Sequence, residues 1–140
     1  MAVTKFRVSE AAALLGVSDD TVRRWADAGR LELSRVAGGP AVIDGVRLAT
    51  LAQELAAQSA LAEAFPAGKA SARNRLTGIV TKVTKDGVMA QVELQAGPFR
   101  IVSLMSREAA DELGLEPGSL ASASVKATTV VVELPDHKEN

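Results

Sequence analysis

The chain has 140 residues, enough for one average domain or two small ones, and its 47% hydrophobic content is sufficient for globular cores. It has no Cys, and its single His, His137, lies in a polar tail, which argues against disulfides, thiol nucleophiles and zinc sites built from these ligands. The 16 basic and 17 acidic side chains nearly cancel, so the overall charge does not drive the protein onto nucleic acid.

The N-terminus has no apolar signal core, and no apolar run approaches the roughly 18 residues of a membrane span. We therefore expect a cytoplasmic protein with no membrane partner. The pattern also lacks a nucleophile–base pair, a metal cluster or a phosphate-cradling Gly-rich motif, so we do not expect an enzyme.

Residues 1–65 predict a small domain that begins with a helix-turn-helix. Ser9 is expected to cap a first helix that ends at Gly16, and Ser18 a second helix that ends at Gly29. Two short helices around a tight turn form a helix-turn-helix. The outer part of its second helix carries three candidate DNA contacts, Thr21, Arg23 and Arg24.

Residues 31–36 and 41–44 predict two short strands around a Gly-rich turn, the shape of a wing, which contains Arg35. The stretch from residue 5 to about residue 50 resembles the winged helix-turn-helix of the MerR and phage-excisionase superfamily. The resemblance implies binding to double-stranded DNA through Thr21, Arg23, Arg24 and Arg35. The motifs that carry it are Ser9-Glu10-Ala11-Ala12, Leu14-Leu15-Gly16-Val17-Ser18, Thr21-Val22-Arg23-Arg24-Trp25, Gly29-Arg30-Leu31 and Gly38-Gly39.

Two features of this half differ from a typical DNA-binding module. Pro40-Ala41-Val42-Ile43 stands where that superfamily usually carries arginines or a His-Arg pair. Residues 1–60 are also neutral, with seven basic residues (Lys5, Arg7, Arg23, Arg24, Arg30, Arg35, Arg47) and seven acidic ones (Glu10, Asp19, Asp20, Asp27, Glu32, Asp44, Glu54). DNA binding would need a concentrated face and avidity in a multimer; the alternative is that Arg23 and Arg24 form a solvated helix face.

Residues 47–65 predict an amphipathic helix, either the last packing helix of the domain or a dimerisation helix. A small-residue linker follows at 66–70. Residues 71–134 then predict five strands with one helix, capped by Ser106, between the third and fourth. This is the outline of an OB-like β-barrel. Residues 135–140 form a polar tail.

The second half resembles the molybdenum-pterin-binding (Mop, or molbindin) family of TOBE domains over residues 70–134. The resemblance implies binding of molybdate, or of tungstate as its near isostere, at sites formed between subunits. The motifs that carry it are Ser71-Ala72-Arg73-Asn74-Arg75-Leu76-Thr77-Gly78-Ile79-Val80, Gly87, Ser103, Ser106, Leu113-Gly114-Leu115, Gly118 and Val125-Lys126-Ala127-Thr128.

The residue types at these motifs suit a tetrahedral dianion. Arg73 and Lys126 supply two positive charges, hydroxyl groups add neutral donors, and backbone N–H groups of small residues can approach closely. Each has a simpler interpretation, since Arg73 and Lys126 could be solvated surface charges and Ser106 a helix cap alone. The candidate molybdate-binding set is Ser71, Ala72, Arg73, Ser103, Ser106, Lys126, Ala127 and Thr128.

The sequence thus predicts an α+β protein, a winged helix-turn-helix followed by a five-stranded OB-like barrel. In layout it resembles the molybdate-responsive transcription regulators, which typically carry two copies of the second domain. We expect a homo-oligomeric, molybdate-sensing DNA-binding regulator. The single barrel favours a hexamer by analogy and the helix-turn-helix a dimer. The alternatives are a molybdate storage protein whose helical domain serves assembly, and a barrel used only for oligomerisation.

Overall fold

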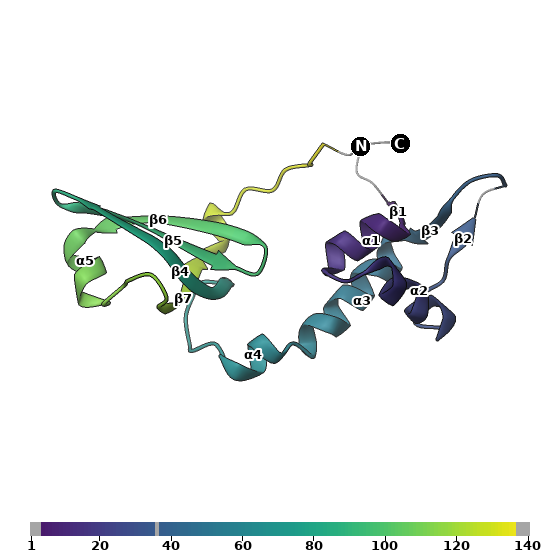
Figure 1. Ribbon diagram of the computed structural model, residues 1–140, viewed down its shortest axis with the longest axis horizontal. Coiled ribbons are helices and arrows are strands. Elements are labelled where there is room, and N and C mark those ends of the chain that lie inside the picture. The colour runs from purple at the N-terminus through teal and green to yellow at the C-terminus, as the bar shows by residue number, and fades with distance from the viewer. Residues whose placement is uncertain (1–3, 36, 137–140) are drawn as a thin grey trace. The chain divides into compact units, whose positions relative to one another are not determined.

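The computed structural model describes residues 4–35 and 37–136. The chain divides into two compact units, one running to Glu63 and the other covering Ala64–Val132 (Figure 1). No helix of the described residues is both long enough and apolar enough to span a membrane.

The N-terminal unit contains helices packed beside a small antiparallel sheet, whose strand order is β1-β3-β2 (Figure 1). Its elements are β1 (Lys5–Arg7), α1 (Val8–Leu15), α2 (Asp19–Asp27), β2 (Ser34–Arg35), β3 (Ala41–Asp44), α3 (Gly45–Ala57) and α4 (Ala60–Ala64). The largest fully buried side chains in this unit are Ile43, Leu51 and Val22, one each from β3, α3 and α2. One core therefore joins the sheet to the helix-turn-helix.

The predicted second helix cap is confirmed, and the first is wrong. Ser18 Oγ accepts a hydrogen bond from the Thr21 backbone N–H at 3.2 Å, and Gly16 ends α1 with a positive φ of 70°. Helix α1, however, begins at Val8, with Arg7 rather than Ser9 in the cap position. The Arg7 backbone N–H donates to Glu10 Oε1 at 2.9 Å, so the carboxylate three residues inside fixes the helix start.

The wing is shorter than predicted, and the long third helix is interrupted. Its first strand is only the two residues of β2, which pair with the start of β3. Residue 36, predicted to belong to that strand, lies outside the described residues. The predicted helix over 47–65 breaks between α3 and α4, where Ser59 Oγ accepts from the Leu61 backbone N–H at 3.3 Å. A serine hydroxyl offers the chain this local alternative to helix continuation.

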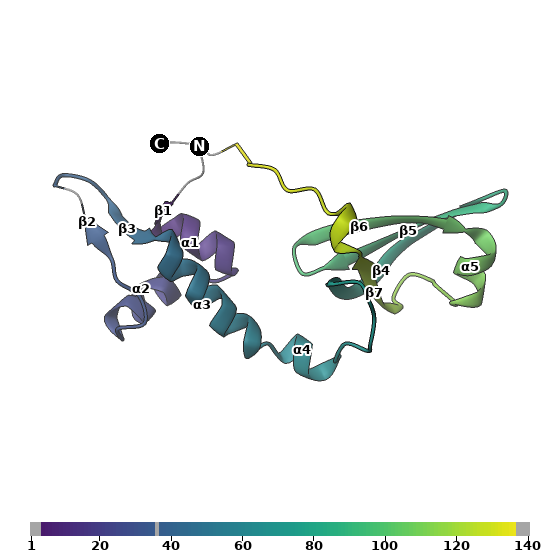
Figure 2. The same cartoon turned by 180° about the vertical axis from the view of Figure 1, so that it is seen from behind.

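The C-terminal unit is a four-stranded antiparallel sheet in the order β6-β5-β4-β7 with one short helix (Figures 1 and 2). Its elements are β4 (Asn74–Asp86), β5 (Met89–Ala96), β6 (Phe99–Ser106), α5 (Arg107–Glu112), β7 (Leu120–Val125) and the 3₁₀ turn η1 (Ala127–Thr129). Gly87 lies in the hairpin turn between β4 and β5, where Asp86 pairs with Met89. The core face carries Val80, Val92, Leu94 and Ala96.

Strand β4 contains a β-bulge, which lies away from its one glycine, Gly78. The register shifts between Val80 and Lys82, so the bulge falls at Thr81. Gly78 has a different role, because a Cβ atom there would lie 2.1 Å from the Gln95 carbonyl oxygen and 2.7 Å from its carbon. The glycine permits a close approach between the backbones of β4 and β5.

The α+β class is confirmed, but the predicted fifth strand is not formed within the described chain. After Val125 the chain enters η1 and leaves the β4–β7 ladder, and residues 130–136 have no ladder partner. Val131 and Val132 are each 88% exposed. The apolar residues that predicted a strand are thus extended but lack a neighbouring strand to pair with.

Candidate functional site

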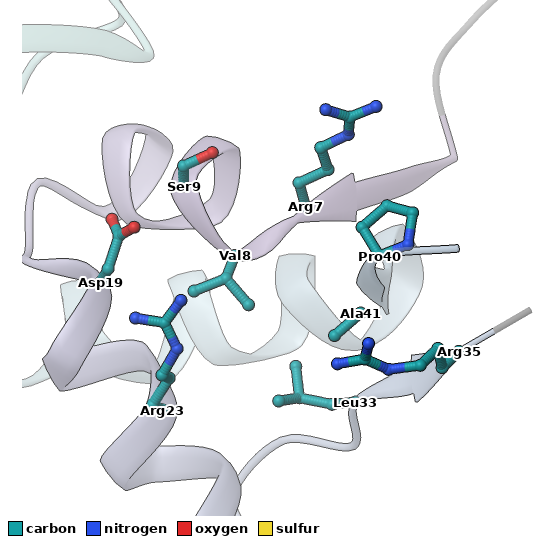
Figure 3. Close-up of a pocket in the computed structure, with 9 residues that line it drawn as sticks. All are labelled: Arg7, Val8, Ser9, Asp19, Arg23, Leu33, Arg35, Pro40 and Ala41. Atoms are coloured by element: carbon teal, nitrogen blue, oxygen red, sulfur yellow. The ribbon is translucent and has the colours of Figure 1, made fainter. Parts of the chain in front are cut away.

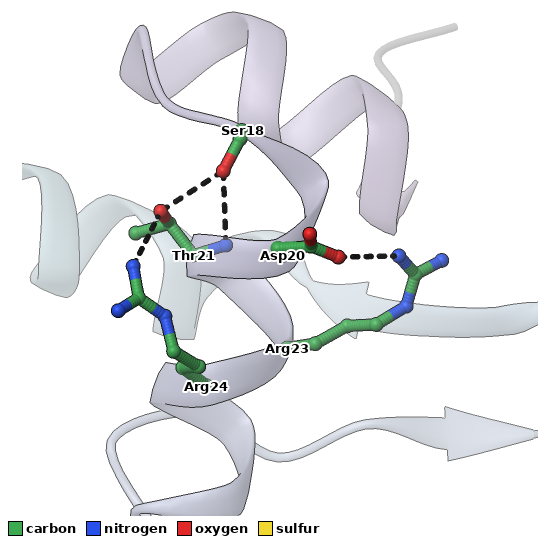
Figure 4. Close-up of polar contacts among 5 residues, drawn as sticks. All are labelled: Ser18, Asp20, Thr21, Arg23 and Arg24. Atoms are coloured by element: carbon green, nitrogen blue, oxygen red, sulfur yellow. Dashed lines mark hydrogen bonds and ion pairs between the residues drawn. The ribbon is translucent and has the colours of Figure 1, made fainter.

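The exposed surface of helix α2 carries the three candidate DNA contacts (Figure 4). Thr21 Oγ1 lies 3.0 Å from Ser18 Oγ and accepts a hydrogen bond from Arg24 Nη2 at 3.0 Å. Arg23 extends to the other side, with Nη1 3.9 Å from Asp20 Oδ1. The helix therefore presents Thr21 with Arg24 on one side and Arg23 on the other. The intrahelical contacts are exposed and cost little to exchange for phosphate contacts.

Arg23 and the wing residue Arg35 line the same cavity of about 340 Å³ (Figure 3). The structure thus brings together two residues predicted independently from the second helix and from the wing. Arg7, which the sequence did not single out, lines this cavity as well. No local signal marks Arg7, because its position follows from the β1–β3 pairing, which sets Arg7 opposite Val42.

Six of the eight candidate molybdate residues lie at one end of the C-terminal sheet. Asn74 pairs with Val125 at the end of the β4–β7 ladder, and Asn74 Nδ2 donates to the Val125 carbonyl oxygen at 3.1 Å. Arg73 and Lys126 are the next residues of the two chain segments beyond this pair. The antiparallel register therefore gathers two cations, with small and hydroxyl neighbours, at one place. This set is Ser71, Ala72, Arg73, Lys126, Ala127 and Thr128.

The other two candidates, Ser103 and Ser106, belong to β6, which does not pair with β7 or β4. Ser103 lies opposite Val92, which lies opposite Val83, nine residues along β4 from Asn74. At roughly 3.3 Å per residue this is about 30 Å of strand. Within one chain the structure therefore separates Ser103 and Ser106 from the six residues around Arg73 and Lys126.

Ser106 is surrounded by charged side chains of its own chain. Its Oγ caps α5 by accepting from the Ala109 backbone N–H at 3.1 Å, which leaves its O–H free to act as a donor. It lines a cavity of about 460 Å³ together with Arg107 and three carboxylates. The hydrogen bond from Lys85 Nζ, at 2.5 Å, is the main cause that lowers the pKa of Asp111, one of these carboxylates.

Both units match known families at the residues just described. A model described as a TOBE domain matches residues 70–132, and one described as a helix-turn-helix domain matches residues 6–56. Neither description is that of an enzyme. The chain belongs to the TOBE-domain family of molybdenum-pterin-binding proteins and carries a helix-turn-helix domain ahead of the TOBE domain.

The relatives match the C-terminal half. The chain is 41% identical over 63 residues to molybdenum-pterin-binding protein 2 of Clostridium pasteurianum, covering 44% of this chain and 93% of that protein. It is 41% identical over 69 residues to molybdenum-pterin-binding protein MopA of Rhodobacter capsulatus, covering 49% of this chain but only 26% of MopA. A solved molybdate binding protein from Sporomusa ovata is 32% identical, covers 47% of this chain and 98% of its own, and superposes with a TM-score of 0.46.

Proposed function

We propose that this protein is a molybdate-responsive DNA-binding regulator. The observation that carries the proposal is the convergence of Arg73 and Lys126 at the end of the β4–β7 ladder, in a chain that also carries a helix-turn-helix domain. Membership of the molybdenum-pterin-binding family gives the ligand, molybdate, and its near isostere tungstate is expected to bind as well.

Two cations suit a doubly charged oxyanion. A dianion removed from water needs close to two opposite charges, and Arg73 and Lys126 supply them. Both side chains are exposed in the single chain, as are the hydroxyl-bearing neighbours Ser71 and Thr128. The site is therefore open on one side, and selection of molybdate over sulfate, which has the same charge, requires a wall that sets the cavity size.

We infer that a second copy of the chain supplies that wall. Ser103 and Ser106 cannot reach the anion held at Arg73 of the same chain, because the β4 strand separates them, but the same residues of a neighbouring copy can. The outer strands β6 and β7 each have one edge without a partner in the described chain, and Val130–Val132 is an exposed extended segment. Such edges and segments favour pairing between copies. The protein is then a homo-oligomer, a dimer or a hexamer.

Ligand binding at such interfaces provides the regulatory link. An anion that stabilises one arrangement of the C-terminal units also fixes how many helix-turn-helix units can engage DNA together, through Thr21, Arg23, Arg24 and Arg35. Because the N-terminal domain is close to neutral, a single unit binds weakly, and paired MerR-type units gain affinity by avidity.

Molybdate storage is the second candidate. It is favoured by the equal numbers of acidic and basic residues over residues 1–60 and by the intrahelical partners that already engage Arg23 and Arg24. In that case the helical domain serves assembly. Storage predicts high uptake of molybdate and no DNA binding above the non-specific level.

The ligand site is tested by calorimetry with molybdate, tungstate and sulfate. Arg73→Ala and Lys126→Ala are each expected to weaken molybdate binding at least about tenfold, since each removes one charge-assisted contact. Lys82→Ala removes an equally exposed lysine from the middle of β4 and is expected to bind like the parent. Parental affinity in both Arg73→Ala and Lys126→Ala would show that the site is elsewhere.

The sharing of the site between copies is tested by mixing two inactive variants, Arg73→Ala and Ser106→Asp. If each anion lies between two chains, a mixed dimer keeps one intact site from the unaltered Arg73 of one chain and the unaltered Ser106 of the other. Random pairing in equal amounts is expected to restore about a quarter of the sites. No recovery on mixing would place the whole site within one chain.

The regulatory role is tested by selecting bound duplexes from a random DNA library with and without molybdate. A regulator enriches a palindromic sequence whose affinity depends steeply on salt and changes with molybdate. Uptake of molybdate without enrichment of any sequence would favour storage instead.

A further inference from the structure

The cavity shared by the helix-turn-helix and the wing is lined by arginines from three different elements (Figure 3). Arg7 comes from the end of β1, Arg23 from α2 and Arg35 from β2. The only acidic residue of the lining is Asp19, so three positive charges and one negative charge leave a net charge of two. The domain as a whole is close to neutral, and this cavity therefore concentrates its positive charge.

The rest of the lining is apolar or weakly polar. Val8, Leu33, Pro40 and Ala41 form apolar walls, and Ser9 contributes a hydroxyl group. In Figure 3, Arg23 and Arg35 approach the space from opposite sides, while the Arg7 side chain extends from β1 with its guanidinium group turned away from theirs. An apolar wall with a cationic rim fits a unit that has a singly charged head and an uncharged ring with C–H groups on its edge, which is the composition of a DNA phosphate with its deoxyribose.

Arg7 stands close to a wing that has fewer basic residues than is usual in this kind of domain. Pro40 and Ala41 occupy the place where basic wing residues would contact the DNA backbone, and they have no charge to offer. The pairing of Arg7 with Val42 brings the Arg7 side chain to the same cavity that Pro40 and Ala41 line. The charge that the wing lacks is thus present on the neighbouring strand.

We propose that the cavity bounded by Arg7, Arg23 and Arg35 seats one backbone phosphate of double-stranded DNA between the second helix and the wing. This inference rests on the proposed DNA-binding function and adds to it a residue, Arg7, and a subsite. A backbone phosphate is the same at every base pair. A contact with it therefore fixes the position of the domain along the duplex without selecting a base sequence.

The test is the salt dependence of duplex binding by the full chain. Arg7→Gln removes the charged head and keeps the backbone N–H that donates to Glu10 Oε1. Loss of one phosphate contact is expected to reduce the steepness of the plot of log association constant against log salt concentration by about 0.9. It should also weaken binding about five- to tenfold near 0.1 M salt, by the same factor for every DNA sequence. Arg7→Lys is expected to recover most of the slope.

The matched control is Arg47→Gln, which removes an arginine that lines a different cavity of the same unit together with Glu32 and Asp44. It is expected to leave the salt slope unchanged, with thermal unfolding used to verify that both variants fold. If the parent binds DNA and Arg7→Gln keeps the parental slope, the phosphate subsite is wrong while the proposed function stands. If the parent does not bind DNA, both are wrong.

A gain of affinity provides an independent check. Asp19 faces the same cavity, where its carboxylate repels a seated phosphate. Asp19→Asn is expected to strengthen duplex binding by about twofold to fivefold, the range of one screened exposed charge pair. The gain should disappear in the Arg7→Gln, Arg23→Gln, Arg35→Gln background. Unchanged or weaker binding by Asp19→Asn would contradict a phosphate at this position.

Discussion

The two units of this protein differ in how complete they are as single copies. The N-terminal unit buries its largest apolar side chains in one core, and one surface of one chain gathers Arg23 and Arg35. Within the described residues, the C-terminal unit has two sheet edges without a partner strand and several large exposed apolar side chains, and its candidate ligands fall into two groups. These exposed side chains include Ile79, Phe99, Leu104 and Leu120, together with Val130–Val132.

This difference separates the properties that one chain sets by itself from those that should depend on assembly. The fold and the candidate DNA-contact surface of the N-terminal unit lie within one chain, so changes there are expected to act locally. The ligand site proposed for the C-terminal unit needs a neighbouring copy, so its affinity for molybdate is expected to depend on protein concentration. A monomer that binds molybdate with full affinity would remove this contrast between the units.

The largest effects are expected from two glycine substitutions, each of which destabilises one of the two units. In Gly78→Ala the new Cβ would lie within 3.0 Å of three backbone atoms of Gln95 and Ala96, which cannot move without breaking the sheet. We expect a loss of about 3 kcal/mol or more in the C-terminal unit. In Gly45→Ala the new Cβ would meet the Thr4 carbonyl oxygen at 2.8 Å, which destabilises the N-terminal unit by about 1–3 kcal/mol.

Calorimetric unfolding of the two variants measures this separation. Gly78→Ala is expected to lower one transition and Gly45→Ala the other, since each unit has its own core. Molybdate binding should fail only in Gly78→Ala. A single transition shifted equally by both substitutions would show that the units do not fold independently.

The next largest losses of stability are expected from two ion pairs, one in each unit. Glu93 pairs with Arg100, and the Glu93 side chain is only 11% exposed, so Arg100→Ala leaves a nearly buried carboxylate without its partner. We expect a loss of about 1–3 kcal/mol by urea unfolding, largely recovered in the double variant with Glu93→Gln. The exposed pair of Arg23 with Asp20 is weaker, and Asp20→Asn should cost less than about 1 kcal/mol.

Two serine caps give a matched pair of smaller effects. Ser18 and Ser106 each accept a bond from a backbone N–H three residues on, at 3.2 and 3.1 Å. Each alanine substitution is expected to cost about 1 kcal/mol of unfolding free energy. The two should differ in ligand binding, because only Ser106 belongs to the candidate molybdate site.

Aspartate and asparagine at position 106 separate the cap from the ligand contact. Both are good caps, so Ser106→Asp and Ser106→Asn should fold with near-parental stability. Ser106→Asp adds a negative charge and is expected to weaken molybdate binding strongly, whereas Ser106→Asn is not. Equal binding by both variants would reduce Ser106 to a helix cap.

The smallest effect concerns pH. Because Lys85 lowers the pKa of Asp111, this pair stabilises the fold above the unfolded carboxyl pKa of about 3.9 and loses its contribution as pH falls through the lower folded value. Lys85→Gln should therefore be slightly less stable than the parent at pH 6 and equal to it near pH 2. A difference that persists at pH 2 would have another origin. The Asp111 side chain is 53% exposed, so solvent screens the pair and the effect is small.

Local signals in the sequence predicted most of the N-terminal elements. Ser18 as a cap and Gly16 as a stop depend on neighbouring residues only, and the structure confirms both. The errors arose where two local signals compete. Glu10 fixes the start of α1 ahead of Ser9, and Ser59 interrupts a segment whose composition favours a continuous helix.

The candidate sites required the pairing of distant segments. The juxtaposition of Arg73 with Lys126 follows from the register of β4 with β7, and that of Arg7 with Arg35 from the sheet of the N-terminal unit. Neither strand register can be deduced from the residues of one segment alone. The sequence predicts two strands after the helix capped by Ser106, but a strand also needs a partner edge, and residues 130–136 have none within the described chain.

Just inside β4, Arg75 Nη1 donates a hydrogen bond to the Phe65 carbonyl oxygen at 3.2 Å. Phe65 lies ten residues earlier in the chain, so this bond closes residues 66–74 into a loop. In the proposed regulator, an anion bound at Ser71 and Arg73 would lie within that loop and stabilise it. Molybdate binding and closure of the segment that leads into β4 would then be linked equilibria.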